Sequence, residues 1–220
     1  MDARAKKISE TMRVRHLDNF KQWRERMKAS GEIKSTYPAL RKDGNLAELV
    51  GTVLGDGHIY KHSRCDSLRI TGDAKKMGFV NYSAYLVEAV FGKKPTISKM
   101  RRSNGMTVTI YEKDISKRLG IPHGSRKDLN YIPPKWILRS RMNKIHFLRG
   151  LYEAEGSLCY HPPTSTHKLF FANKNQHLLK LVATLVESLG FKQNTYINKV
   201  QVSRKMEVQE LKDLLHFRSY

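Results

Sequence analysis

The chain has 220 residues, and its 41 Lys and Arg residues against 20 Asp and Glu residues give a formal net charge of +21. A hydrophobic share of 40% is enough to build a core, which argues against a wholly disordered basic chain. The absence of a long apolar run, of an apolar segment behind the basic start and of more than two cysteines argues against a membrane span, a secretory signal and a disulfide framework. We therefore expect an intracellular protein, from the cytoplasm of a prokaryote or from an organelle, with a polyanionic partner.

Residues 1–43 form a basic N-terminal extension. Its apolar residues recur at spacings of three to five, a pattern that predicts one or two helices, and Gly31 and Pro38 interrupt it. The segment could be a packing extension or an arm that grips DNA, and the sequence leaves both open.

From residue 44 onward the chain contains the same pattern twice. Leu46–Gly57 and Ile145–Gly156 align without gaps at an offset of 99 residues. Each copy predicts a helix that ends in an acid and a glycine, then two short strands, a long helix, two more strands and a final helix. The dipeptide at residues 104–105, Asn-Gly, predicts a hairpin turn in the first copy. We expect two pseudo-symmetric repeats, 44–120 and 143–220, joined by a proline-containing linker over 121–142.

Small residues occupy matching places in the two predicted motif helices. Gly51 and Gly55 lie four apart in the first helix, and Gly150 and Ala154 stand at the same places in the second. Small residues at this spacing let two helix backbones approach closely. Because a glycine within a helix costs about 1 kcal/mol relative to alanine, we expect these glycines to serve a direct contact between the helices.

Each motif helix is predicted to end in a carboxylate, Asp56 in the first copy and Glu155 in the second. An acid at the negative end of a helix dipole is disfavoured, and two such acids held together repel unless a cation lies between them. Hard cations such as Mg²⁺ prefer carboxylate and phosphate oxygens. The pair therefore points to metal-assisted phosphodiester hydrolysis, although two surface acids remain the alternative.

The segments LVGTVLGDG and LRGLYEAEG resemble the two signature helices of the LAGLIDADG homing endonuclease family, and residues 44–216 follow that family's duplicated αββαββα order. The resemblance implies an α+β fold of two pseudo-symmetric halves, whose antiparallel sheets form a DNA-binding saddle. It implies that Asp56 and Glu155 bind the catalytic metals, with Gly55 and Ala154 beside them in the metal site. It also implies Mg²⁺ as the cofactor, with Mn²⁺ able to substitute and Ca²⁺ supporting binding without cleavage.

The same family carries a basic residue near the metals, at the end of the second strand of each repeat. In this sequence the resemblance points to Lys174 and to Lys75, which stands 99 residues before it. Counting back from Gly92 and Gly190 selects Lys76 in place of Lys75. A lysine there could stabilise the charge that develops on the phosphate, whereas the plainer interpretation of Lys174 is a phosphate contact at a helix start.

The predicted strands supply a surface that could read DNA. An antiparallel sheet that packs one face on helices leaves its other face free to enter a groove, where Arg and Lys read guanine and Asn and Gln read adenine. A solvated sheet face is the alternative. The candidate DNA-binding residues are Lys61, His62, Arg64, Arg69, Thr71, Lys99, Arg101, Arg102, Thr107 and Thr109 in the first copy, and Tyr160, His161, His167, Lys168, Asn194, Tyr196, Asn198, Lys199, Gln201, Ser203 and Arg204 in the second.

These features together predict a monomeric, site-specific, metal-dependent double-stranded DNA endonuclease with a long asymmetric target. The family resemblance also implies an intron-encoded enzyme. Two alternatives stay open: an RNA maturase that binds intron RNA and assists splicing, and a DNA-binding regulator that kept the scaffold and lost catalysis. We do not expect an intein, because the sequence lacks Cys or Ser at its start and His-Asn at its end.

Overall fold

The computed structural model describes residues 2–15, 20–33, 37, 39–101 and 103–219. The chain divides into two compact units, Met1–Ala39 and Leu40–Tyr220. The first unit contains two basic helices, α1 (Ala3–Val14) and α2 (Lys21–Ala29), and neither has a buried residue among those described. Residues 16–19, which separate these helices in the sequence, lie outside the described part.

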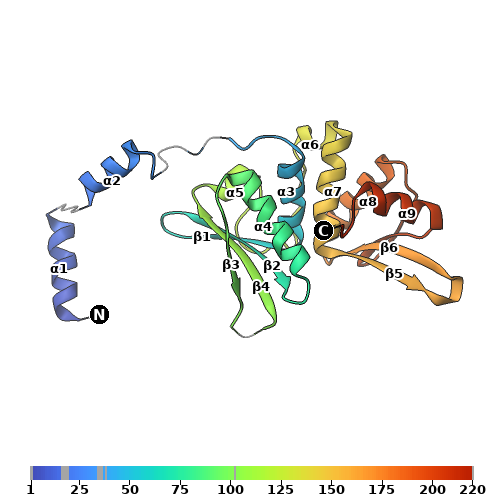
Figure 1. Cartoon of the computed structure of the whole chain (residues 1–220), viewed down its shortest axis with the longest axis horizontal. Coiled ribbons are helices and arrows are strands. Elements are labelled where there is room, and N and C mark those ends of the chain that lie inside the picture. Colours follow the sequence, from blue (N-terminus) through green and yellow to red (C-terminus); the bar gives the residue numbers. More distant parts are fainter. Residues whose placement is uncertain (1, 16–19, 34–36, 38, 102, 220) are drawn as a thin grey trace. The chain divides into compact units, whose positions relative to one another are not determined.

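The first half of the second unit has the predicted order of elements. Its four strands form one antiparallel sheet in the order β1-β2-β4-β3 (Figure 1). The elements are α3 (Gly44–Asp56), β1 (Gly57–Lys61), β2 (Asp66–Asp73), α4 (Met77–Phe91), β3 (Thr96–Lys99), β4 (Gly105–Glu112) and α5 (Ile115–Leu119).

The second half repeats this order and this sheet topology, with strands in the order β5-β6-β8-β7. The predicted α+β class and the duplicated αββαββα order are therefore confirmed. The elements are α7 (Arg141–Glu155), β5 (Gly156–His161), the 3₁₀ turn η1 (Pro162–Thr164), β6 (Thr166–Ala172), α8 (Gln176–Ser188), β7 (Asn194–Tyr196), β8 (Lys199–Val202) and α9 (Lys205–Leu214).

Two local features differ from the sequence prediction. The β3–β4 hairpin is present, but β3 ends at Lys99 and Gly105 is already the first residue of β4, so the Asn-Gly pair does not make a two-residue turn. The segment expected as a plain linker contains a short helix, α6 (Lys135–Arg139), because Pro134 can precede a first helical turn without losing a hydrogen bond. Helix α7 then begins at Arg141, where the Ser140 hydroxyl accepts from the backbone N–H of Asn143 at 3.3 Å.

Helices α3 and α7 lie side by side between the two sheets (Figure 1). Gly51 and Gly150 allow this approach, because a Cβ on Gly51 would overlap the carbonyl oxygen of Phe147 and a Cβ on Gly150 would overlap that of Glu48. The predicted direct contact between the motif helices is therefore present. Each sheet covers its half of the core with one face, through the buried side chains of Leu68, Ile70, Val108 and Ile110 in the first half and Leu169, Phe171, Val200 and Val202 in the second.

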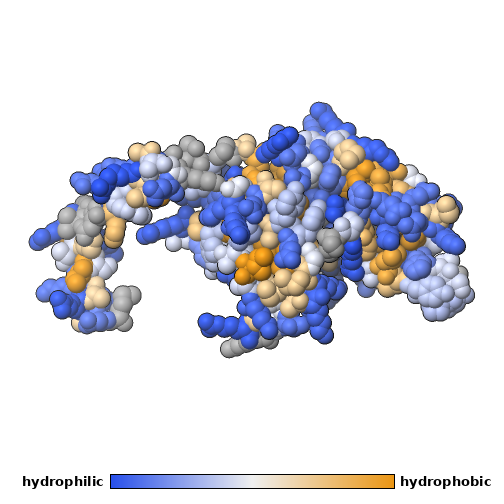
Figure 2. All heavy atoms as spheres, in the orientation of Figure 1, coloured by the Kyte–Doolittle hydropathy of each residue, from blue (hydrophilic) through white to orange (hydrophobic). Residues whose placement is uncertain are grey.

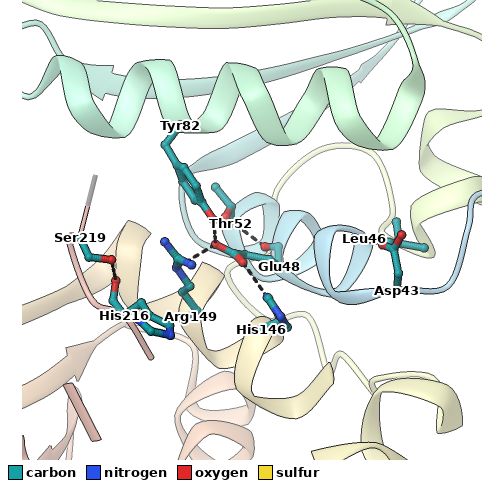
Figure 3. A network of polar contacts seen from close by, with 9 residues as sticks. All are labelled: Asp43, Leu46, Glu48, Thr52, Tyr82, His146, Arg149, His216 and Ser219. Atoms are coloured by element: carbon teal, nitrogen blue, oxygen red, sulfur yellow. Dashed lines mark hydrogen bonds and ion pairs between the residues drawn. The ribbon is translucent and has the colours of Figure 1, made fainter. Parts of the chain in front are cut away.

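A buried charged network also ties the helix pair to α4 (Figure 3). The carboxylate of Glu48 is 1% exposed and accepts a hydrogen bond of 2.7 Å from the Tyr82 hydroxyl. Its oxygens lie 2.9 Å from Nδ1 of His146 and 3.1 Å from Nε of Arg149, both on α7. The Arg149 guanidinium also lies 4.7 Å from the centre of the Tyr82 ring. One carboxylate therefore joins three helices.

The surface reflects the composition of the chain. Hydrophilic residues cover much of the face seen in Figure 2, interrupted by smaller apolar patches. Within the described residues, no helix combines the length and the apolar character that crossing a membrane requires.

Candidate active site and nucleic-acid interface

The two motif acids are the last residues of the two packed helices. Asp56 ends α3 and Glu155 ends α7, and a glycine in extended conformation follows each of them and starts a strand. Gly55 and Ala154 stand one residue earlier and touch across the helix pair, since a Cβ on Gly55 would overlap that of Ala154 and would lie 3.2 Å from Cγ of Glu155. The small residues thus bring the two helix ends, and with them the two acids, close together.

The pKa of each of the two carboxylates is raised, so the ionised forms are disfavoured in the folded chain. Burial and, to a smaller extent, the negative charge of Glu155 together raise the pKa of Asp56 to about 7, although the positive charge of Lys76 opposes both. Burial also raises the pKa of Glu155, against a hydrogen bond of 3.2 Å in which the Asn173 amide donates to its carboxylate. A cation between these groups would remove the cost of ionising both.

The carboxylates of Asp56 and Glu155 fit a hard divalent cation whose remaining ligands are phosphates and waters. The described residues contain no group of three or more His, Cys, Asp or Glu side chains placed to hold a metal, so a cage built wholly of side chains is absent there. Mg²⁺ does not need such a cage, because it commonly binds through one or two carboxylates together with phosphates and waters. The carbonyls of Gly55 and Ala154 belong to last helical turns, whose carbonyls lack partners within the helix.

A cavity of about 640 Å³ opens beside Asp56, and both Lys75 and Lys76 line it. Lys76 is the one whose charge lowers the pKa of Asp56. The ambiguity between the two lysines has a structural reason. In the first half, Gly57 pairs with Ile70, and the N-cap of the next helix is Lys76, six residues later. In the second half, Gly156 pairs with Phe171, and the N-cap of the next helix is Asn175, only four residues later. The first half is two residues longer there.

Glu155 contacts a residue that the sequence analysis did not single out. Lys174 is exposed, and the residue that contacts Glu155 is Asn173, immediately before it. The next residue, Asn175, is buried and caps α8 by accepting from the backbone N–H groups of His177 and Leu178. Sequence reasoning did not select Asn173, because its contact depends on how β6 ends rather than on any motif.

Glu153, at the earlier acidic position of the second motif, is 5% exposed and accepts a hydrogen bond of 2.5 Å from the backbone N–H of Arg218. Glu153 therefore makes a hydrogen bond that ties α7 to the C-terminal segment of the chain. Arg218 itself lines the cavity beside Asp56 and was not predicted.

The open face of the first sheet is fixed by strand pairing. Residues directly opposite each other in an antiparallel pair share a face. Arg69 lies opposite His58 and Thr109, and Thr71 lies opposite Thr107. Together with Lys99 and Arg101 these residues line a hollow of about 590 Å³ on the sheet.

The second sheet has an equivalent open face with a hollow of about 340 Å³. Lys168 lies opposite Cys159 across β5 and β6, and Gln201 lies opposite Phe170 and Asn194. Lys199 lies opposite Tyr196, with its Nζ 5.1 Å from the centre of the Tyr196 ring. His161 has the same parity along β5 as Cys159 and so shares this face.

Strand pairing separates some of the candidate DNA-binding residues from the open faces of their sheets. Lys61 pairs with the buried Asp66, and His167 pairs with Tyr160 at a ring distance of 5.3 Å. Asp66, the partner of Lys61, is three residues from Arg69 on β2, and His167 is one residue from Lys168 on β6, so the pleat turns Lys61 and His167 away from the open faces. Strand pairing therefore argues against the expected face for Lys61 and His167, whereas Tyr160 and Lys99 border the hollows of the two open faces.

The remaining candidates lie in turns or hold local contacts. His62 lies 3.0 Å from the Ser67 hydroxyl, Ser203 accepts from the Gln201 amide at 2.7 Å, and Arg204 pairs with Glu207 at 2.9 Å. Arg64 and Asn198 lie in the β1–β2 and β7–β8 turns. Arg102 lies outside the described residues.

The comparisons with known proteins agree with this architecture. A family model described as LAGLIDADG-like domain matches residues 143–220. Homing endonuclease I-DmoI of Desulfurococcus mucosus is 27% identical over 167 residues, which cover 70% of this chain and 75% of that protein. The tRNA-splicing ligase RtcB of Pyrococcus furiosus is 28% identical over 136 residues, which cover 53% of this chain. The chain spans only 14% of the length of that ligase.

Solved structures show the same fold. I-DmoI in complex with DNA and Mn superposes with a TM-score of 0.54 at 18% identity, covering 80% of this chain and 96% of that one. The N-terminal LAGLIDADG domain of DUF199/WhiA superposes with a TM-score of 0.56 at 14% identity, covering 83% of this chain and 86% of that domain. At these identities the likeness concerns the fold.

Proposed function

The chain belongs to the LAGLIDADG family, and from this premise we propose that it is a site-specific double-stranded DNA endonuclease that uses a divalent metal ion. One observation carries the proposal: two partly buried carboxylates, Asp56 and Glu155, meet at the ends of packed helices in a chain with a net charge of +21. Surface acids without a task would not be held together in a position that raises the pKa of both.

In this proposal the two acids hold Mg²⁺, with the carbonyls of Gly55 and Ala154 beside them. When bound, the cation would activate a water molecule and stabilise the leaving oxygen of the phosphodiester. Asn173 keeps the Glu155 carboxylate oriented through its amide, and Lys76 supplies positive charge next to Asp56. Lys75 and Lys174 are proposed as further basic groups that contact the DNA backbone near the two centres.

The solved relatives support the choice of metal. I-DmoI has been solved with DNA in the presence of Mn, of Ca and, as a variant, of Mg. We propose the same cation class here, with Mg²⁺ or Mn²⁺ supporting cleavage and Ca²⁺ supporting binding alone.

The proposed DNA partner lies across the open faces of both sheets. These faces carry different residues, Arg69 and Thr71 in the first half against Lys168 and Gln201 in the second, so the two halves of the target should differ in sequence. Since one chain contains both motifs, we propose that a monomer inside the cell binds one long asymmetric site. The short overlap with RtcB gives no support for ligase activity.

The test is cleavage of a randomised duplex library in Mg²⁺, in Ca²⁺ and in EDTA. The proposal predicts double-strand cuts at one recurring sequence in Mg²⁺, retention of that sequence without cutting in Ca²⁺, and neither product in EDTA. Selective binding with no cutting in any cation would favour a DNA-binding regulator. Preferential binding of a structured intron RNA over duplex DNA would favour a maturase.

A further inference from the structure

Two arginines that the repeat does not predict make the same contact in the two halves. Arg126 follows the last helix of the first half, and its Nη2 donates to the carbonyl of Gly57. Arg218 follows the last helix of the second half, and its Nη2 donates to the carbonyl of Gly156 at 2.9 Å. These glycines are equivalent, and each comes directly after a motif acid.

Each arginine also borders a cavity of the opposite half, and the two cavities are equivalent. Arg218 borders the cavity of Asp56 together with Phe79 and Glu153. Arg126 borders a second cavity together with Leu178 and Leu54. Leu178 stands 99 residues after Phe79, and Leu54 stands 99 residues before Glu153, so these residues are equivalent in the repeat. The arginines thus form a pseudo-symmetric pair across the helix interface.

The pair differs in access. The cavity at Arg126 measures only about 30 Å³, and Leu129 and Tyr131 also line it. The Asn175 amide donates to the carbonyls of Arg126 and Leu129 at 2.9 and 2.8 Å. The Nε and Nη1 groups of Arg126 are buried without a hydrogen-bond partner among the described residues. The cavity at Arg218 measures about 640 Å³ and contains Lys75 and Lys76 as well.

Arg218 is exposed, but its backbone and its guanidinium are both fixed by contacts. Its φ of 54° lies in the left-handed region, which costs a non-glycine residue on the order of 1 kcal/mol. The Glu153 carboxylate fixes its backbone N–H, Gly156 fixes its guanidinium, and the guanidinium also lies 4.7 Å from the centre of the Phe217 ring. The bond to Gly156 uses one of five guanidinium N–H donors, and a phosphate is the group that the others match in pairs.

We propose that Arg218 is a further substrate-contacting residue, whose guanidinium binds a phosphate of the DNA strand that enters the Asp56 cavity. Arg126 is its buried counterpart, which only supports the fold. The two cleavage centres are therefore not equivalent: one combines Asp56 with exposed cationic groups, and the other combines Glu155 with Asn173. This inference rests on the proposed function, and it also explains why an acid stands at position 153, where the first half has Leu54.

The test compares Arg218→Ala and Arg218→Lys with wild type and with a matched control, Arg139→Ala, an exposed arginine before the opposite end of α7. The first readout is the salt slope of binding to a duplex of random sequence. The second is cleavage of the library-selected duplex with each strand labelled separately. A further variant, Glu153→Leu, copies the first half and releases the Arg218 backbone without removing the guanidinium.

We expect Arg218→Ala to lower the salt slope by about 0.9, the value for one lost phosphate contact, while Arg218→Lys keeps most of the slope. We expect Arg218→Ala to slow cleavage of one strand about 10²-fold more than that of the other, so that nicked duplex accumulates. Glu153→Leu should shift cleavage in the same direction by a smaller factor. Equal behaviour of Arg218→Ala and Arg139→Ala in both readouts would overturn the inference. If wild type cuts no duplex, the proposed function fails, and the salt slope alone still decides whether Arg218 contacts phosphate.

Discussion

Asp56 and Glu155 end two helices that touch, and burial together with the negative charge of Glu155 raises the pKa of Asp56 to about 7. This relationship exists only because Gly51, Gly55 and Gly150 let the two backbones meet. The packing of the two helices therefore holds two carboxylates close together, where their ionisation destabilises the metal-free fold. This arrangement is expected of a cation site.

The first prediction concerns stability against pH without metal. The model-peptide value of the Asp56 pKa is 3.8 and the folded value is about 7, so the folded chain holds this proton more tightly than the unfolded chain. The free energy of unfolding contributed by Asp56 is therefore present at low pH and is lost as pH rises through 7. Because Asn cannot ionise, Asp56→Asn should avoid this loss, and in EDTA at pH 8 it should melt roughly 2–6 °C above wild type. Thermal melts at pH 5 and pH 8 measure it, and an identical pH response in both proteins would contradict it.

Added Mg²⁺ should reverse that order. Because the cation competes with the proton on Asp56, the increase in Tm that it gives wild type should be larger at pH 8 than at pH 6. Asp56→Asn should show little increase at either pH. Ca²⁺ serves as the second cation, since it should also raise the Tm of wild type and leave that of Asp56→Asn nearly unchanged.

The second prediction concerns the helix contact. Gly150→Ala places a methyl group into the backbone of α3 at Glu48, so the helices must separate and the free energy of unfolding should fall by about 3 kcal/mol or more. The matched control is Gly92→Ala, which meets no atom within 4 Å and carries only the backbone strain of a φ of 61°, about 1 kcal/mol. Urea unfolding compares them. An equal loss in the two variants would mean that the helices do not depend on close contact at Gly150.

The third prediction concerns the network around Glu48. Replacing Glu48 by Gln leaves Arg149 facing a neutral side chain in a buried place, which should cost about 3–5 kcal/mol. Tyr82→Phe removes one hydrogen bond and should cost only about 1–2 kcal/mol. In a double-mutant cycle, the variant that carries both Glu48→Leu and Arg149→Leu should be more stable than either single variant, because no charge is then left without its partner. Additive losses would show that the two residues are not coupled.

The fourth prediction uses the pleat as an internal control. Arg69→Ala and Lys168→Ala remove side chains from the two open faces and should weaken binding of the selected duplex by about 1–3 kcal/mol each. Lys61→Ala removes the same charge from the opposite face of the first sheet and should change binding by less than half of that. Titration of labelled duplex at one salt concentration measures all three. A similar loss in Lys61→Ala would mean that charge alone decides binding.

Much of the architecture follows from the sequence because it is encoded twice. Gly51 and Gly150, and the acids that follow them, recur at one offset, so the helix pair and its carboxyl ends could be predicted from spacing. The faces of Lys61 and His167 could not, because a shift of one residue along a strand reverses every side chain. The two-residue difference between the halves also explains why Lys75 and Lys76 could not be separated by counting.

The contacts that the sequence did not reveal are those between distant segments. Asn173 reaches Glu155 only because β6 ends beside α7, and Glu48 finds Tyr82 and Arg149 only through the packing of three helices. Arg126 and Arg218 do not stand 99 residues apart, so the internal repeat hides their equivalence. Such residues carry no spacing signal, and only the folded chain identifies them.

The central claim is that Asp56 and Glu155 together hold the catalytic cation, and it is tested most directly on the duplex that wild type selects. Asp56→Asn and Glu155→Gln should bind that duplex within about threefold of wild type in Ca²⁺, because each change keeps the shape of the side chain and removes one negative charge. In Mg²⁺ both variants should cut it at least about 10³-fold more slowly than wild type. Cutting by either variant at the wild-type rate would contradict the account.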